Sequence, residues 1–262
     1  MSEKSLLVAI DTCGPAGSVA LGRLSADVVE IDAEQELEGR SYSATLTVAL
    51  ARLVEEAGAR LADIGGIVVV HGPGSFTGVR IGLSTAKGLA EGLGIPIVAV
   101  SRLAVLAAKA GTGAAALDAH RNEVFLRLEQ ASGQTIDPAL KSKHRAPSIS
   151  QVLSRNGWES YALSKGRINR ELLAGAAELA AVAPSPERVA VCDDSAARLV
   201  GEAWPAAELA FVAAPLASDA LRLGALRLSA GQSDDVLLLD GNYLRRSDAE
   251  IFGEAAAGVK SA

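Results

Sequence analysis

The chain has 262 residues, of which 49% are hydrophobic and 3% aromatic, and it carries a formal net charge of −6. This length suits two small domains with cores of Ala, Val, Leu and Ile, and the acidic balance argues against binding nucleic acid through global charge. Two cysteines outside any metal-ligand spacing, with neither a secretory signal nor a long apolar segment, predict a reduced cytoplasmic protein that does not contact a membrane.

The first 110 residues predict a domain in which helices follow an initial group of strands. A continuous apolar run precedes Asp11, and the Gly, Pro and Ser residues that follow it indicate a turn. From Val28 apolar and acidic residues alternate, which is typical of a half-exposed strand. Stripes of Leu and Ala then predict amphipathic helices. The expected order is strands 6–10, 19–22 and one from 28, helix 41–57, strand 67–70, helix 77–93, strand 95–100 and helix 101–110.

A second domain is expected after the glycines at 111 and 113. Its first hairpin, strands 115–118 and 123–129, repeats the pattern of the first domain, because Asp118 ends a strand as Asp11 does. The repeat suggests an internal duplication. We therefore expect domains at 1–110 and 114–246, followed by a tail at 247–262. The later elements expected are strands 188–192 and 209–212 and helices 194–203 and 218–230.

The run His-Gly-Pro-Gly-Ser-Phe-Thr-Gly-Val-Arg-Ile-Gly, residues 71–82, predicts a strand, a tight loop and a helix start. It lacks the Gly-Lys-Ser/Thr of a phosphate-binding Walker loop, although a helix N-terminus can attract an anion. Four glycines, at 78, 82, 88 and 92, each cost the helix about 1 kcal/mol relative to Ala. The stripe of Gly78, Gly82 and Ala86 permits close approach of another backbone, either from the chain's own sheet or from a partner's helix.

This run resembles the TsaB family, as do residues 8–12, 118–124 and 242–245, although Arg is more usual in the family at His120. The resemblance covers residues 5–140 and 188–246. It implies an α/β fold of two duplicated actin- and hexokinase-like domains. It also implies a non-catalytic subunit that binds and activates a TsaD-type transferase. With a TsaE-type ATPase, this complex forms N6-threonylcarbamoyladenosine at position 37 of tRNAs that read codons beginning with A.

The resemblance also implies that helices equivalent to 41–58 and 77–93 form the partner interface, which favours an interface role for the glycine stripe. An uncovered glycine face predicts a homodimer of the isolated chain, and tRNA is reached through the complex. An ATP or ADP molecule at the interface is left open, and no other cofactor is expected. The expected interface residues are Leu46, Leu50, Leu53, Thr77, Gly78, Arg80, Ile81, Gly82, Thr85, Ala86 and Leu89.

Catalytic features of the relatives are missing. The catalytic relative carries a His-x-x-x-His metal pair where this chain has Ser101 to Ala107 without histidine, so neither a metal site nor a catalytic residue is predicted. Asp11 and Thr12 retain part of a phosphate turn, but Pro15 and Ala16 remove donors, and Asp11 can instead cap the turn. An independent actin-fold ATPase or small-molecule kinase is the alternative. A peptidase is disfavoured for lack of the metal pair and a catalytic triad.

Three smaller expectations concern individual side chains and one segment. Cys13 is interpreted as a structural thiol rather than a nucleophile. Asp118 and Glu123 are expected to make hydrogen bonds within their hairpin. Residues 141–187 are interpreted as an insertion, and 141–170 holds seven basic residues against one acid, a net charge of +6. This insertion is either a solvated helical segment or a contact to tRNA through Lys141, Lys143, Arg145, Lys165, Arg167 and Arg170.

Overall fold

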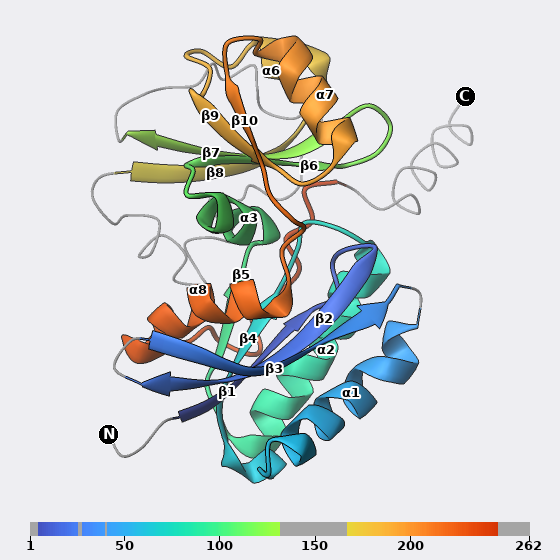
Figure 1. Cartoon of the computed structure of the whole chain (residues 1–262), viewed down its shortest axis with the longest axis vertical. Coiled ribbons are helices and arrows are strands. Elements are labelled where there is room, and N and C mark those ends of the chain that lie inside the picture. The colour runs from blue at the N-terminus through green and yellow to red at the C-terminus, as the bar shows by residue number, and fades with distance from the viewer. Residues whose placement is uncertain (1–4, 26–27, 40, 132–166, 246–262) are drawn as a thin grey trace, which may run out of the picture.

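The computed structural model describes residues 5–25, 28–39, 41–131 and 167–245. They form two lobes, each built on a five-stranded mixed sheet (Figure 1). The first sheet has the order β3-β2-β1-β4-β5 and consists of β1 Ser5–Asp11, β2 Ala16–Ser25, β3 Val28–Glu38, β4 Ile64–Val70 and β5 Ile97–Val100. The second has the order β10-β9-β6-β7-β8 and consists of β6 Ala114–Asp118, β7 Val124–Ala131, β8 Arg167–Ala174, β9 Arg188–Val191 and β10 Glu208–Phe211.

The two sheets share one topology. In each sheet the first three strands are antiparallel, the fourth strand pairs parallel with the first, and the fifth pairs parallel with the fourth. A helix follows each of the third, fourth and fifth strands. The predicted α/β class is therefore confirmed. The helices are α1 Tyr42–Glu56, α2 Phe76–Leu93 and α3 Arg102–Ala110 after the first sheet's strands, and α6 Ala176–Ala180, α7 Asp194–Ala203 and α8 Ala217–Ser229 after the second's; a short 3-10 turn spans Leu61–Asp63.

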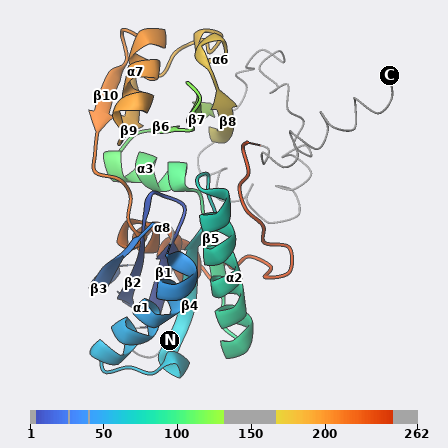
Figure 2. The ribbon, with the colours of Figure 1, turned by 90° about the vertical axis from the view of Figure 1, so that its right-hand side faces the viewer.

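The last helix of each half of the chain, α3 or α8, packs between the two sheets. Helices α1 and α2 cover one face of the first sheet and α8 covers the other, while α3 packs on the second sheet and against α8 (Figures 1 and 2). Leu221 of α8 is fully buried in the first lobe's core, and Leu106 of α3 packs with Leu117 of β6. Each sheet is built from one side of the boundary expected near residue 110, but the helices between the sheets come from both halves of the chain. The division into two domains therefore stays a prediction.

Local chemistry explains where the helices begin and end. Ser75 and Ser101 accept hydrogen bonds from the backbone N–H groups of Gly78 and Ala104, which caps α2 and α3. Ser41 does not cap α1 with its side chain, because its hydroxyl donates to the Glu38 carbonyl at 2.8 Å. None of the helices in the described ranges is long and apolar enough to span a membrane.

The predicted insertion at 141–187 is wrong for its second half. Residues 167–174 form β8, which pairs antiparallel with β7 and completes the second sheet, and α6 follows it. Arg167 and Arg170 therefore belong to a sheet strand, and Arg170 is half-buried. Lys141, Lys143, Arg145 and Lys165, with the expected tail at 247–262, lie outside the described residues.

After α8 the chain stays with the first lobe and runs beside α2 (Figure 2). We call residues 231–245 the C-terminal segment. Asp234 accepts a hydrogen bond of 2.7 Å from the Ala99 amide of β5 and pairs with Arg227 of α8 in a buried ion pair of 2.7 Å. The backbone N–H of Asn242 then donates to the His71 carbonyl at 2.7 Å. The segment is thereby fixed at both of its ends to the first lobe.

Candidate functional site

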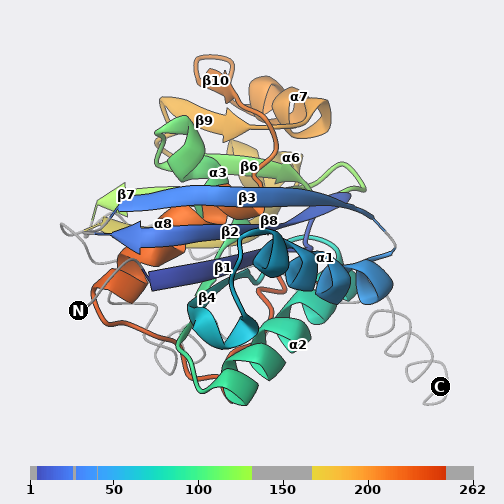
Figure 3. The ribbon, with the colours of Figure 1, turned by 60° about the horizontal axis from the view of Figure 1, so that its bottom comes forward.

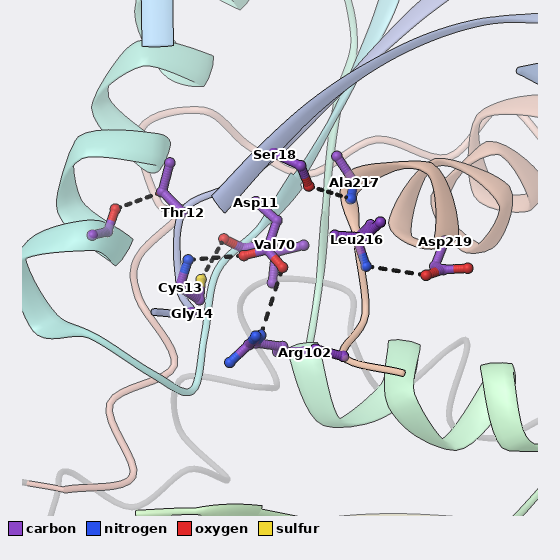
Figure 4. Close-up of polar contacts among 12 residues, drawn as sticks. Asp11, Thr12, Cys13, Gly14, Ser18, Val70, Arg102, Leu216, Ala217 and Asp219 are labelled. Atoms are coloured by element: carbon purple, nitrogen blue, oxygen red, sulfur yellow. Dashed lines mark hydrogen bonds and ion pairs between the residues drawn. The ribbon is translucent and has the colours of Figure 1, made fainter. Parts of the chain in front are cut away.

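The turn after β1, where a weak phosphate site was expected, is held by an internal cation (Figure 4). The Asp11 side chain is 2% exposed, and one of its carboxylate oxygens accepts from the Cys13 amide at 2.8 Å. The other lies 3.6 Å from Nε of Arg102, the first residue of α3, whose side chain is 9% exposed. A carboxylate buried this deeply needs such a partner, so Asp11 and Arg102 stabilise the turn together.

The guanidinium of Arg102 also fills the space beneath Gly14. A Cβ atom added at Gly14 would lie 2.4 Å from Nη2 of Arg102. The Tyr42 hydroxyl donates to the Gly14 carbonyl at 2.9 Å, and burial raises the pKa of this phenol to about 12, so it remains a donor at neutral pH. The turn that would cradle a phosphate is therefore occupied by side chains of the protein itself.

Thr12 is likewise used within the chain. It is 0% exposed, and its hydroxyl donates to the Gly78 carbonyl of α2 at 2.6 Å. The expectation that Asp11 and Thr12 offer a weak cofactor site is therefore corrected, because the side-chain oxygens of both bind groups of the protein. Cys13 fits its structural interpretation: its thiol donates to the Val70 carbonyl at 3.2 Å, and burial raises its pKa well above the ordinary value.

The glycines of α2 lie on two different faces. A Cβ at Gly78 would lie 2.0 Å from the Thr12 carbonyl oxygen, and one at Gly82 would lie 2.3 Å from the Thr12 hydroxyl. This face therefore packs on the protein's own first strand. Gly88 and Gly92, in contrast, are exposed, and among the described residues no atom outside the adjoining helix backbone lies within 4 Å of a Cβ added at either position.

This result corrects the expected partner interface. Six of its residues lie in the chain's own core and present no surface to a partner: Leu46, Leu50, Leu53, Gly78, Gly82 and Ala86. Thr77 and Arg80 are exposed, and Ile81, Thr85 and Leu89 are half-buried, so these five stay a prediction. Helices α1 and α2 lie side by side (Figures 2 and 3). We define the α1–α2 surface by its small and apolar exposed or half-buried residues, Ala44, Val48, Ala51, Ile81, Thr85, Gly88 and Gly92.

The equivalent turn of the second lobe, between β6 and β7, is built from polar contacts. His120, Arg121 and Asn122 all have positive φ angles, of 61°, 56° and 61°. Asp118 accepts from the His120 amide at 2.8 Å, which confirms its predicted role within the hairpin. Glu123 instead pairs with Arg245 of the C-terminal segment, so the expectation that its side chain bonds within the hairpin is wrong. In the described ranges, no three His, Cys, Asp or Glu side chains are grouped to hold a metal ion.

A polar cluster around Glu171 of β8 joins the lobes. Its carboxylate accepts from Ser101 at 2.6 Å, from Arg127 of β7 at 2.9 Å and from Asn242 of the C-terminal segment at 2.6 Å. The carboxylate side chain is 13% exposed, and charge-assisted hydrogen bonds of this kind offset the cost of its burial. Glu171 therefore connects the second sheet, the start of α3 and the C-terminal segment.

His71, at the end of β4, gives the fold a predicted acid sensitivity. Burial lowers the pKa of its imidazole below the ordinary 6.5, an effect that the nearby Glu171 carboxylate partly opposes. Below about pH 6.5 the unfolded chain takes up a proton that folded His71 resists, so stability is lost as pH falls. We expect a loss of up to about 1.3 kcal/mol per pH unit from this residue.

Urea denaturation at about pH 7.5 and at about pH 5.5 measures this effect. The free energy of unfolding should fall more between the two conditions in the wild type than in His71→Gln. Equal falls in the two proteins would show that other groups cause the acid sensitivity.

The comparisons with known proteins agree with this architecture. The structure defines a class of two-lobed α/β proteins. In this class the turn after β1 is occupied by the protein's own side chains, and helices α1 and α2 present a surface of small residues. The model of the family described as "TsaD: tRNA N6-adenosine threonylcarbamoyltransferase" matches residues 33–221. TsaB of Escherichia coli K12 is 38% identical over 125 residues, 45% of this chain and 52% of that protein. TsaB of Bacillus subtilis is 38% identical over 128 residues, 47% of this chain and 55% of that protein.

A solved structure extends the likeness over most of the chain. YeaZ from Pseudomonas aeruginosa is 25% identical, with a TM-score of 0.58 over 92% of this chain and 100% of that one. An uncharacterized protein of Mycobacterium tuberculosis H37Rv is 30% identical over 139 residues, 53% of this chain and 65% of that protein. The matched part thus spans about half to two thirds of the curated relatives. The chain belongs to the family that the matching model describes and, by its named homologues, to the TsaB proteins within it.

Proposed function

We propose that the chain is a non-catalytic subunit of the complex that forms N6-threonylcarbamoyladenosine on tRNA, and that it binds a TsaD-type transferase through the α1–α2 surface. The names of the TsaB relatives support this pathway. The observation that carries the interface is the pair Gly88 and Gly92. Each glycine costs α2 about 1 kcal/mol relative to Ala, and no described part of the chain uses the space that it leaves.

The surroundings of these glycines suit a helical partner. Val48 of α1 is 65% exposed, and Ala44 and Ala51 lie one turn before and nearly one turn after it on the same helix. Small residues let another helix approach closely, and the exposed valine supplies apolar area to bury. The same surface would be covered by a second copy when the partner is absent, so we also propose that the isolated chain forms a homodimer.

The non-catalytic role is supported by what fills the first turn. Arg102 begins the helix that matches the one on which the catalytic relative carries its metal-binding histidines, and here it pairs with Asp11. The matched topologies of the two sheets support duplicated actin-like domains. A TsaE-type ATPase and tRNA would join through the assembled complex. The kinase-like alternative loses support, because Arg102, Tyr42 and Thr12 are all committed to closing the turn.

Reconstitution with the TsaD-type protein of the same organism tests this proposal. We expect a stable complex on size-exclusion chromatography, and modified tRNA only when both subunits and the ATPase are present. The isolated chain should turn over no ATP with candidate small-molecule substrates. Substrate-dependent ATP turnover by the pure chain, without complex formation, would overturn the partner role in favour of the kinase-like alternative.

A further inference from the structure

A pocket of about 210 Å³ opens between α2 and the C-terminal segment, which lie beside one another in Figure 2. Arg80 and Lys87 supply two positive charges to its wall, and Leu83 and Leu239 supply apolar surface. Drug-sized ligands usually take pockets of roughly 300–1,000 Å³. The volume here fits a single side chain better than a cofactor, and the lining is mainly polar, with two cationic groups for a charged tip.

The guanidinium of Arg80 is fixed in advance by aromatic rings. Its central carbon lies 3.9 Å from the centroid of the Phe76 ring, and that ring lies 4.8 Å from the ring of Tyr243. Burial raises the pKa of the Tyr243 phenol, an effect that the neighbouring Arg80 partly opposes, so the phenol is neutral. A stacked arginine loses less rotamer freedom than a free one when it binds a second group.

The residues that line the pocket carry more positive than negative charge. Among the residues that the structure describes, no carboxylate oxygen lies within 4.0 Å of the charged groups of Arg80 or Lys87. Lys87 donates to the Leu239 carbonyl at 3.1 Å, and Asp240 is the one acid among the lining residues. Two cations against one carboxylate leave a positive site on a chain whose net charge is −6.

The pocket borders the α1–α2 surface. Ser84 lines the pocket and lies one helical turn before Gly88, so these two exposed residues share a face of α2. The opposite wall of the pocket includes Tyr243. The residue before it, Asn242, donates a hydrogen bond to Glu171 of the second lobe, and this bond fixes the position of that wall. A partner that packs on Gly88 would therefore meet a preformed positive pocket at the edge of its contact.

We propose that this pocket receives a carboxylate side chain, Glu or Asp, from the TsaD-type partner; this inference rests on the proposed function. Arg80 and Lys87 would donate charge-assisted hydrogen bonds to that carboxylate, while Leu83 and Leu239 would contact its methylene groups. Such a pair fixes the register of two packed helices and discriminates against partners that lack the acid.

Charge reversal tests the proposal. The dissociation constant for the TsaD-type protein is measured at low and high salt for the wild type, Arg80→Glu, Lys87→Glu and the control Arg222→Glu. Arg222 lies on α8, across the first sheet from α2, and is 57% exposed. We expect Arg80→Glu to weaken binding at least about tenfold and to flatten its salt dependence, and Arg222→Glu to change neither. An acid-to-Lys substitution in the partner should restore binding to Arg80→Glu.

The outcomes separate this inference from the proposed function. If Arg80→Glu and Lys87→Glu bind like the wild type while Gly88→Leu does not, the partner role stands and the pocket proposal fails. If the wild type does not bind, the proposed function itself fails. Inorganic phosphate that binds the isolated chain through Arg80 without weakening partner binding would make the pocket an anion site and overturn the carboxylate assignment.

Discussion

We expect Gly78→Ala and Gly88→Ala to change stability in opposite directions, although both replace glycine by alanine in α2. The added methyl at position 78 would lie 2.0 Å from the Thr12 carbonyl oxygen, so the helix or β1 must move. Overpacking of this kind costs about 1–3 kcal/mol, and we expect the upper end because the obstacle is backbone. At Gly88 the added methyl meets no described atom within 4 Å apart from the adjoining helix backbone, so alanine should raise the free energy of unfolding by about 0.5–1 kcal/mol.

Urea denaturation of the two variants measures the difference directly. Each variant controls for the other, because helix propensity changes equally in both. Stabilisation by both substitutions would show that the Gly78 face is not packed on Thr12, and the corrected assignment of the two glycine faces would then be wrong.

Asp234→Ala should cause a large loss of stability. Its side chain is 1% exposed, and it accepts from Arg227 at 2.7 Å and from the Ala99 amide at 2.7 Å. Removing one member of a buried ion pair leaves the other charge uncompensated, which costs about 3–5 kcal/mol. Asp234→Asn keeps an acceptor for Ala99 and should lose less.

Glu208→Ala is the matched control, because it breaks the exposed pair with Arg188, where the side chains are 67% and 46% exposed. Exposed pairs are worth about 0–1 kcal/mol, so this variant should unfold like the wild type. Limited proteolysis should also cut Asp234→Ala in the C-terminal segment, which loses its attachment to β5. Equal stability of Asp234→Ala and Glu208→Ala would contradict the anchoring role of the buried pair.

Elements with local signals could be predicted from the sequence. The apolar runs of β1 and β4 and the stripes of α1 and α2 depend on neighbouring residues, and their bounds agree with the structure to within a few residues. Strand β8 could not be found in this way. Its charged residues look solvated in sequence, and the partners that allow Glu171 to be buried, Ser101, Arg127 and Asn242, come from distant segments.

In the candidate site, too, features set by neighbouring residues could be predicted, whereas contacts between distant segments could not. Gly88 follows Gly78 by ten residues, nearly three turns, which rotates it about 80° around the helix. Helical geometry alone therefore separates two glycine faces, but only the packing of Thr12 shows which one is already covered. The role of Arg102 was also beyond prediction, since its contact with Asp11 joins residues 91 positions apart.

Binding of the TsaD-type protein to Gly88→Leu tests the central claim most directly. In the described part of the chain, no atom outside the adjoining helix backbone lies within 4 Å of a Cβ added at position 88, so the leucine should not lower stability. Ser195→Leu adds the same side chain at an exposed position of α7 in the second lobe. By titration calorimetry, we predict that the wild type and Ser195→Leu bind equally and that Gly88→Leu binds at least about tenfold more weakly, a difference of about 1.4 kcal/mol. Wild-type affinity in Gly88→Leu would contradict the account.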